Sequence, residues 1–407
     1  MVSSSLQERI AAFLPEQWQG EKGLFGLRGG ARGYLLSLIA RQSRRPILII
    51  APTTREAESL FFDLAFFLGE ERSLPPLEKR LHLFPSWEIL PLEKLSPHLE
   101  NVAARLEGLY HLIEGQNPVL VSTPAALMQR VLPKEVLKQS YRYLVAGAEL
   151  DREALLEHLA AWGFQNVPMA EERGDFSVRG AIVDIFPPAY SWPLRLEFFS
   201  DRLEAIRDFD PATQRSQGAR QELLLLPMKE FSLRGEETRL AGKEIEKRAD
   251  ELELGRKEKK SLLEAIGSGI PFAGMEFLVP YFYPGLPSLF SYLPPGSLIW
   301  LDQAAQVEKE VERLERLVWE RGARAKEEGR VTPPVESLYL SEAQWRAEIS
   351  PFPLLSSESL EVIPPKGKAA NVFLSVKSYL NTDIHQEVAV QGKEPSLAPL
   401  AGRLKAW

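Results

Sequence analysis

The residues best suited to chemistry stand in a glycine-rich loop near the start of the chain. The loop runs from Gly26 to Gly33, after a short apolar run and before a stretch with helical periodicity. A working phosphate loop has the form G-x-x-x-x-G-K-[ST], in which the lysine contacts nucleotide phosphates and the hydroxyl binds magnesium. Here Ala31, Arg32 and Gly33 occupy the last three positions, so the lysine and the hydroxyl are both missing. Arg32 and the backbone amides could still attract an anion, but the pattern favours a degenerate loop without nucleotide hydrolysis.

A second degenerate motif follows an apolar run at 297–301. Helicases that hydrolyse nucleotides end such a strand with the acidic motif D-E-x-H, which holds magnesium and a water molecule. This chain has Asp302 and Gln303 there, so the first acid is present and the second is not. Two degenerate halves, each between a strand and a helix, predict a nucleotide-hydrolase fold that has lost its chemistry. The opposing hypothesis is an ATP-binding or ATP-hydrolysing helicase fragment that uses Arg32 and Asp302.

A third group of residues indicates protein binding rather than catalysis. Side chains along a strand alternate between its two faces, and every second residue of Leu194–Phe199 is apolar and belongs to a core face. Arg195 and Phe199 share the opposite face, with Arg179 adjacent in the neighbouring strand region. Arginine and aromatic residues are enriched at protein interfaces. We therefore predict a binding surface, and we expect that truncation of its side chains would barely change the stability of the fold. The alternative is a surface phenylalanine covered by a loop.

Composition and spacing exclude several other kinds of site. The 407 residues include no cysteine, which excludes a disulfide scaffold, a cysteine-ligated metal centre and a cysteine nucleophile. No two of the five histidines stand four residues apart, so a helical histidine pair for a metal is absent. Asp175 and Asp184 lie close in an apolar hairpin, where turn and strand-end roles are favoured over paired acid–base work. We predict no catalytic residue, no metal site and no cofactor in this chain.

Charge and hydropathy limit the partners and the location. The net charge of −7 gives no support for autonomous DNA binding through bulk electrostatics. The longest apolar runs are far too short to cross a bilayer, and the first residues lack the order of a signal peptide. We therefore predict a cytoplasmic protein without a membrane partner.

The elements that must position these residues alternate between strands and helices. The run Pro46–Ala51 is continuously apolar, as in a strand buried on both faces. Ser96-Pro97 predicts the start of a helix, with a cap followed by proline. Such alternation predicts an α/β fold with a parallel sheet. Further along, two close strands at Ser177–Phe186 and Leu194–Phe199 predict a small α+β domain instead.

These changes of pattern divide the chain into four segments. Residues 1–138 are the first part of a parallel-sheet domain, and residues 139–226 are an inserted α+β domain. Residues 227–388 complete the parallel-sheet domain and add a linker. In 389–407 an apolar helical stripe is still running at the last residue, which predicts the start of a truncated further domain.

Several long, ordered motifs support a family assignment. They are Phe84–Glu88, Leu95–His98, Arg105-Leu106, Arg179–Pro187, Arg195–Phe199 and Phe209–Ser216. Together they resemble the N-terminal region of the bacterial transcription-repair coupling factor family, Mfd, and the resemblance covers about residues 20–390.

The resemblance implies a fold and a function. Full-length members recognise RNA polymerase stalled at a DNA lesion, and a C-terminal superfamily 2 motor, an ATP-dependent DNA translocase, removes it. The N-terminal part resembles UvrB, with a degenerate RecA-like domain of the P-loop type and an inserted α+β domain. It recruits UvrA for nucleotide excision repair of the transcribed strand. ATP, magnesium, RNA polymerase and double-stranded DNA would then concern only the missing C-terminal part.

Motif by motif, the UvrA-contacting residues of the family fall on Arg179, Arg195 and Phe199. Only the short segment Pro85–Ser96 separates a strand from a helix where UvrB carries its DNA-clamping hairpin. We therefore expect a UvrA-recruiting module that is not itself an enzyme. The alternatives are an ATP-binding helicase fragment and a UvrB-like fragment that binds damaged DNA.

Overall fold

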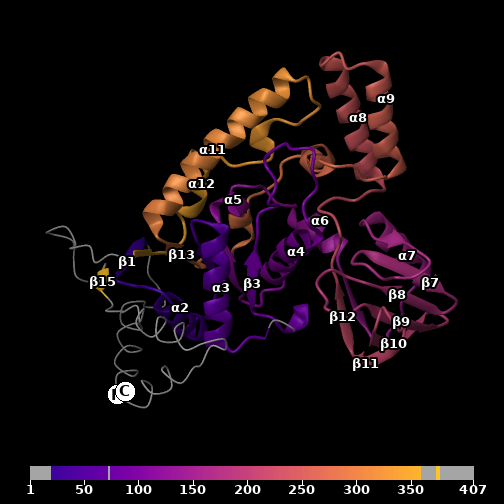
Figure 1. Ribbon diagram of the computed structural model, residues 1–407, viewed down its shortest axis with the longest axis horizontal. Helices are drawn as coiled ribbons and strands as arrows, with labels where there is room; N and C mark the ends of the chain where they lie inside the picture. Colours follow the sequence, from indigo (N-terminus) through magenta and orange to yellow (C-terminus); the bar gives the residue numbers. More distant parts are fainter. Residues whose placement is uncertain (1–19, 72–73, 359–372, 376–407) are drawn as a thin grey trace, which may run out of the picture.

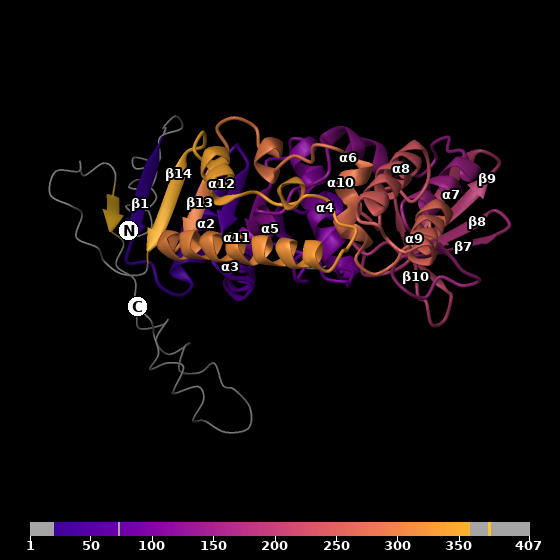
Figure 2. The ribbon, with the colours of Figure 1, turned by 90° about the horizontal axis from the view of Figure 1, so that it is seen from above.

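The computed structural model describes residues 20–71, 74–358 and 373–375 (Figure 1). The chain builds one body around a seven-stranded sheet and a second body around a six-stranded sheet. Figure 2 shows the two bodies side by side along the long axis of the molecule. The predicted segment 389–407 lies outside the described residues, and the four segment boundaries stay predictions.

The seven-stranded sheet is parallel throughout, with the order β15-β1-β14-β13-β2-β4-β3. Strand β13 lies between β2 and β14, so the centre of the sheet is completed by strands that follow the second body in the chain. The predicted α/β parallel-sheet fold is confirmed. The strands are β1 (Glu21–Phe25), β2 (Ile47–Ile50), β3 (Leu81–Phe84), β4 (Val119–Ser122), β13 (Leu298–Asp302), β14 (Leu354–Glu358) and β15 (Phe373–Ser375).

Helices cover both faces of this sheet, so strand β2 is buried at all four positions. Ile47 and Ile49 pack against helices α2 and α3, whereas Leu48 and Ile50 belong to the core that contains α4 and α11. Removing apolar surface from water on both sides is what the continuous apolar run predicts. The covering helices are α2 (Ala31–Gln42), α3 (Thr54–Leu68), α4 (Leu99–Ile113), α5 (Pro124–Leu127), α11 (Ala304–Glu327) and α12 (Glu342–Ile349).

Local signals account for the ends of some helices and not of others. The Thr53 hydroxyl accepts a hydrogen bond from the Glu56 amide at the start of α3, and Gly69 ends that helix in the left-handed conformation, which suits a residue without a Cβ atom. Helix α4 begins at Leu99 instead of directly after Ser96. The Ser96 hydroxyl donates to the distant carboxylate of Glu276, so a tertiary contact replaces the expected cap.

The second body is an antiparallel sheet in which only the short strand β6 runs parallel to its neighbour β7. The predicted single strand Ser177–Phe186 is wrong, because Gly180 has a φ of 61° and turns the chain into the hairpin of β7 and β8. Helix α7 (Arg152–Ala161) packs Leu155 and Leu159 into the core of this body. The strands are β6 (Gln165–Asn166), β7 (Asp175–Arg179), β8 (Ile182–Ile185), β9 (Leu194–Phe199), β10 (Arg202–Phe209) and β11 (Ser216–Arg220).

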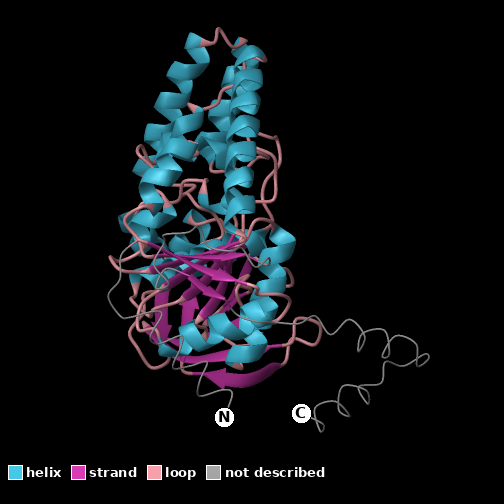
Figure 3. Ribbon diagram, turned by 90° about the vertical axis from the view of Figure 1, so that its left-hand side faces the viewer, coloured by secondary structure: helices cyan, strands magenta, loops and turns pink. Residues whose placement is uncertain are grey.

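Shorter elements join the two bodies and extend beyond them. Strands β5 (Arg142–Val145) and β12 (Glu222–Leu225) pair antiparallel where the chain enters and leaves the second body. Figure 3 shows the helices that extend beyond the sheets, among them α8 (Glu236–Glu251) and α9 (Arg256–Ser268). The remaining elements are α6 (Lys134–Ser140), α10 (Val279–Phe282) and the 3₁₀ turns Pro76–Glu78, Met275–Leu278, Leu289–Tyr292 and Val335–Ser337. No helix in the described part of the chain is both long and apolar enough to span a membrane.

A buried ion pair holds the chain where it returns from the second body. Arg105 of α4 donates from Nε to the Glu230 carboxylate over 2.7 Å, and both side chains are buried. Trp87 donates to the same carboxylate oxygen over 3.1 Å. The Arg105 guanidinium also lies over the ring of Phe84, 4.8 Å from its centroid. The segment before the insertion is thereby fixed to the segment after it.

Replacement of Arg105 by methionine should lower the free energy of unfolding by about 3–5 kcal/mol, because Glu230 would become an unpaired buried charge. Urea denaturation measures the effect. The double variant Arg105→Met/Glu230→Gln removes both charges and keeps an acceptor for Trp87, so it should recover much of the loss. Equal loss in both variants would show that the charge pairing is not what stabilises this contact.

Candidate functional site

The predicted binding residues come together on the open face of the six-stranded sheet. Strand register places Arg179 opposite Ile182, and Ile182 opposite Glu197. Arg195 lies opposite Asp184 in the next row of the same face. Leu194, Leu196 and Phe198 are buried on the other side of β9. The predicted alternation along this strand is therefore confirmed.

Exposure separates the three predicted residues. The Phe199 ring is 75% exposed, and the Arg179 side chain is 44% exposed. The Arg195 side chain is only 12% exposed and lies over the ring of Phe209, 4.8 Å from its centroid. Arg195 does face away from the apolar core, but it is packed against the sheet rather than solvated.

Asp184 is the centre of the polar contacts on this face, although its side chain is only 1% exposed. Arg195 approaches it with two parallel hydrogen bonds, Nε to Oδ1 over 2.7 Å and NH2 to Oδ2 over 2.9 Å. Arg179 donates to the same Oδ2 atom. The sequence suggested a strand-end role for Asp184 and missed this one, because the two arginines are identified as its partners only by strand register.

This arrangement corrects the expectation that truncation of Arg195 would barely change stability. An alanine there would remove both of the parallel hydrogen bonds that reach the buried Asp184 carboxylate. A buried carboxylate that loses such bonds destabilises the folded state. For Phe199, whose ring is exposed, the expectation stands as a prediction.

The two degenerate phosphate motifs also meet, and they meet as an ion pair. The Arg32 guanidinium lies 2.5 Å from the buried Asp302 carboxylate. The Ser357 hydroxyl donates to the other carboxylate oxygen over 2.9 Å. Burial raises the pKa of Asp302, and the Arg32 charge opposes that rise. The position of a magnesium-binding acid is thus neutralised by the arginine that replaces the phosphate-loop lysine.

Helix α3 occupies the space that a phosphate-loop hydroxyl would need. A Cβ atom built on Gly33 would lie 2.5 Å from the Cβ atom of Asp63, which is closer than real Cβ atoms approach. Gln303, at the position of the second acid, donates to the Glu56 carboxylate of the same helix over 3.0 Å. Gly26 and Ala31 mark the two ends of a loop that leads from β1 into α2. The loop is therefore packed against protein at each of the positions that carry chemistry in working loops.

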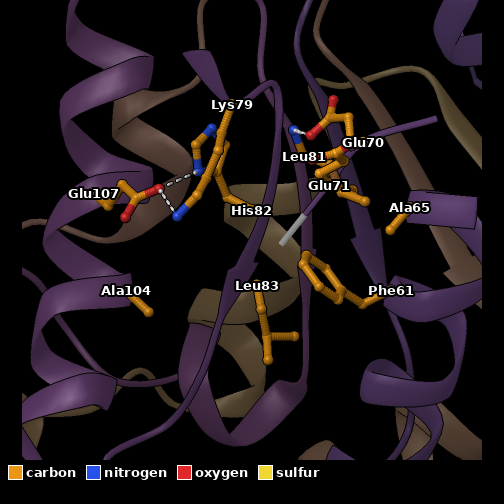
Figure 4. Close-up of a pocket in the computed structure, with 10 residues that line it drawn as sticks. All are labelled: Phe61, Ala65, Glu70, Glu71, Lys79, Leu81, His82, Leu83, Ala104 and Glu107. Atoms are coloured by element: carbon orange, nitrogen blue, oxygen red, sulfur yellow. Dashed lines mark hydrogen bonds and ion pairs between the residues drawn. The ribbon is translucent and has the colours of Figure 1, made fainter. Parts of the chain in front are cut away.

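A buried polar cluster beside this sheet was not found from the sequence. Figure 4 shows Lys79 and His82 directed at Glu107, next to a cavity of about 220 Å³. The Glu107 carboxylate lies 3.3 Å from the Lys79 ammonium and 3.2 Å from the His82 Nδ1 atom. Although burial opposes ionisation, these partners hold the pKa of Glu107 below its usual value. The i,i+4 spacing of Glu107 and His111 on one helix was the available signal.

This cluster contains the kinds of side chain that bind metals, but its geometry favours an internal network. Ligand-type atoms of His82, Glu107 and His111 lie within 4.8 Å of one another. The two imidazole rings are stacked, with centroids 4.3 Å apart and planes 29° apart, so their nitrogen lone pairs do not converge on one point. His111 already bonds the Gln116 amide and the Pro76 carbonyl. The expectation of no metal site stays a prediction.

Comparisons with known proteins identify the inserted body. A family model of the UvrB interaction domain matches residues 143–231. The chain is 34% identical over 389 residues to a transcription-repair-coupling factor of Myxococcus xanthus, which covers 94% of this chain and 32% of that protein. The factor of Escherichia coli is 30% identical over 371 residues, with 88% and 31% covered. The factor of Haemophilus influenzae is 28% identical over 332 residues, with 82% and 27% covered.

The chain belongs to the transcription-repair coupling factor family. It corresponds to the N-terminal, UvrB-like module of that family, as the motifs suggested. The coupling-factor module spans about a third of the length of the curated relatives it matches. Arg179, Asp184, Arg195 and Phe199 all lie within the part that matches the UvrB interaction domain.

One buried histidine, His111, and one partly buried histidine, His158, should make the stability of the coupling-factor module depend on pH. Burial lowers the pKa of His111 and of His158 from 6.5 to about 4. The unfolded chain therefore binds protons below about pH 6.5 that the folded chain does not bind until about pH 4. The free energy of unfolding should therefore be highest above about pH 6.5 and should fall as the pH decreases toward about 4. The His111 contribution should be about 1–2 kcal/mol between about pH 7.5 and 5.

Urea denaturation at the two pH values measures this dependence. The variant His111→Gln should show a smaller loss than the unchanged chain. His98 is exposed, so His98→Gln is the matched control and should leave the loss unchanged. A pH dependence that is identical in all three proteins would contradict the prediction.

Proposed function

We propose that this module recruits UvrA during nucleotide excision repair of the transcribed strand. The observation that carries the proposal is that an exposed Phe199 ring and a partly exposed Arg179 share one open sheet face, within the segment that matches the UvrB interaction domain. Aromatic rings and arginines in the centre of an interface carry most of its binding energy. The family resemblance supports UvrA as the partner, since its UvrA contacts fall on these residues.

The chemistry of the face fits a partner with carboxylates next to an apolar pocket. Phe199 would bury its ring when the partner covers it, which removes apolar surface from water. Arg179 uses both hydrogens of its NH2 group for Asp184 and Gln214. Its Nε and NH1 groups donate no hydrogen bond within the described residues, so three of its five N–H donors are available to a partner.

Within this proposal the parallel-sheet body has a structural role and does not hydrolyse nucleotides. The Arg32–Asp302 ion pair and the contact between Gly33 and Asp63 support the loss of nucleotide chemistry in this module. ATP and magnesium would then serve a translocase motor in the remainder of the full-length protein, where RNA polymerase and double-stranded DNA would also bind. The module would act in the cytoplasm, where bacterial DNA is transcribed.

The module should neither bind ATP tightly nor hydrolyse it, because the lysine, the hydroxyl and the second acid are all missing. Titration of a fluorescent ATP analogue and a phosphate-release assay with magnesium test this. The double variant Arg32→Gln/Asp302→Asn is the control, since it removes both charges and leaves neither buried alone. Magnesium-dependent turnover that disappears in this variant would favour the alternative function, an ATP-hydrolysing helicase fragment.

Replacement of Phe199 by alanine should weaken UvrA binding by more than about tenfold. Truncation of a central aromatic residue typically costs about 2–4 kcal/mol, and roughly 1.4 kcal/mol corresponds to a factor of ten. Calorimetric titration with purified UvrA measures the affinity, and the melting temperature should barely change.

The buried Leu196, on the opposite face of the same strand, provides the matched control. Leu196→Ala should lower the free energy of unfolding by about 2–5 kcal/mol, as a core truncation does. Its folded fraction should bind UvrA normally. Unchanged binding by Phe199→Ala, or no binding by the unaltered chain, would overturn the proposed function.

A further inference from the structure

On the open sheet face, the buried residue Asp184 bonds both Arg179 and Arg195. Asp184 is 1% exposed and accepts three hydrogen bonds, two from Arg195 and one from Arg179. A residue so deeply buried has almost no surface to offer a partner. Its three bonds instead fix the positions of two guanidinium groups.

Arg195 has little capacity left for a partner. Two of its hydrogen bonds go to Asp184, and its NH1 group donates to the Gln214 carbonyl over 3.2 Å and to the Ser216 hydroxyl over 3.3 Å. Four of the five N–H donors of an arginine are thus used inside the module. Its ring contact with Phe209 covers one face of the guanidinium as well.

The loop between β10 and β11 completes this support. Asp210 bonds the backbone amides of Ala212 and Thr213 and so shapes the loop. Gln214, with a φ of 59°, accepts from Arg195 through its backbone and from Arg179 through its side chain over 3.3 Å. The loop therefore touches both arginines at once.

We propose that Asp184 is a positioning residue for partner binding, which acts by presenting Arg179 in a fixed orientation on the same sheet face as Phe199. Arg195 helps to hold Asp184 and Gln214 in place and does not pair with a partner carboxylate. Arg179 and Phe199 make the direct contacts, and the partner supplies a carboxylate that meets the remaining Nε and NH1 donors of Arg179. This inference rests on the proposed UvrA function and divides its three candidate residues into two kinds.

The reason for this division is entropic. A free arginine side chain must lose rotamer freedom when it pairs with a carboxylate, and this loss of entropy weakens binding. An arginine already held by Asp184 and Gln214 has lost that freedom during folding, so binding does not bear the cost again. Without Asp184 the two guanidiniums would also repel each other at close range.

A double-mutant cycle with purified UvrA tests the proposal. Asp184→Asn keeps the shape of the side chain but removes its charge, and it should weaken binding about five- to tenfold. In a chain that already carries Arg179→Ala, the same change should weaken binding less than about twofold, because Asp184 acts through Arg179. A purely structural role would give the same factor in both backgrounds and would overturn the proposal.

Two further variants keep the test decisive. Val183 is buried on the opposite side of the same strand, so Val183→Ala should lower the melting temperature without changing the affinity of the folded protein. If Asp184→Asn does not fold, Gln214→Asn replaces it, because asparagine tolerates the positive φ and only shortens the reach to Arg179. It should weaken binding about two- to fourfold, again only when Arg179 is present.

The outcomes separate the two proposals. If Phe199→Ala weakens UvrA binding while Asp184→Asn and Gln214→Asn do not, the recruitment function stands and the positioning role is wrong. If Phe199→Ala and Arg179→Ala both bind as the unaltered chain does, the proposed function fails and the positioning role fails with it.

Discussion

The buried pair of Arg105 and Glu230 is the interaction on which the arrangement of the chain depends. The central strand β13 of the parallel sheet follows the inserted body in sequence but lies beside β2, which precedes that body. The chain must therefore leave the sheet, build a second body and return to the same core. Arg105 belongs to the segment before the inserted body and Glu230 to the segment after it. Their contact therefore holds these two segments together. An ion pair is suited to this position because neither charge tolerates burial alone. Any arrangement of the chain that separates Arg105 from Glu230 would leave a buried charge unpaired and would be less stable.

The same principle recurs at two other places where a buried carboxylate is paired with arginine. Asp302 is matched by Arg32, and Asp184 is matched by Arg195 and Arg179. In each case a carboxylate that could be chemically active is occupied by a guanidinium of the same chain. The consequences differ with exposure. At the phosphate loop the Arg32 side chain is 19% exposed, whereas at the open sheet face the Arg179 side chain is 44% exposed and reaches solvent.

Much of this fold can be predicted from local patterns, because a period of two or a continuous apolar run depends only on neighbouring residues. The burial of Ile47–Ile50 and the exposure of Phe199 are of this kind. The features that could not be predicted join residues far apart, such as Arg32 and Asp302, which are 270 positions apart in sequence. The burial of Arg195 follows from a loop that folds over it, and no periodicity encodes such a loop. Similarly, Ser96 has the sequence of a helix cap but bonds Glu276 instead.

The close approach of Gly33 to Asp63 has a consequence for protein engineering. A designer who wished to reinstall nucleotide binding would begin with lysine and threonine at positions 32 and 33. The first change would remove the arginine that pairs with Asp302, and the second would place a Cβ atom 2.5 Å from the Cβ atom of Asp63 in helix α3. Helix α3 would have to move outward before a side chain at position 33 could be accommodated. A two-residue change that restores the lysine and the hydroxyl in sequence would therefore not restore the local geometry, because Asp63 of helix α3 occupies the space beside position 33.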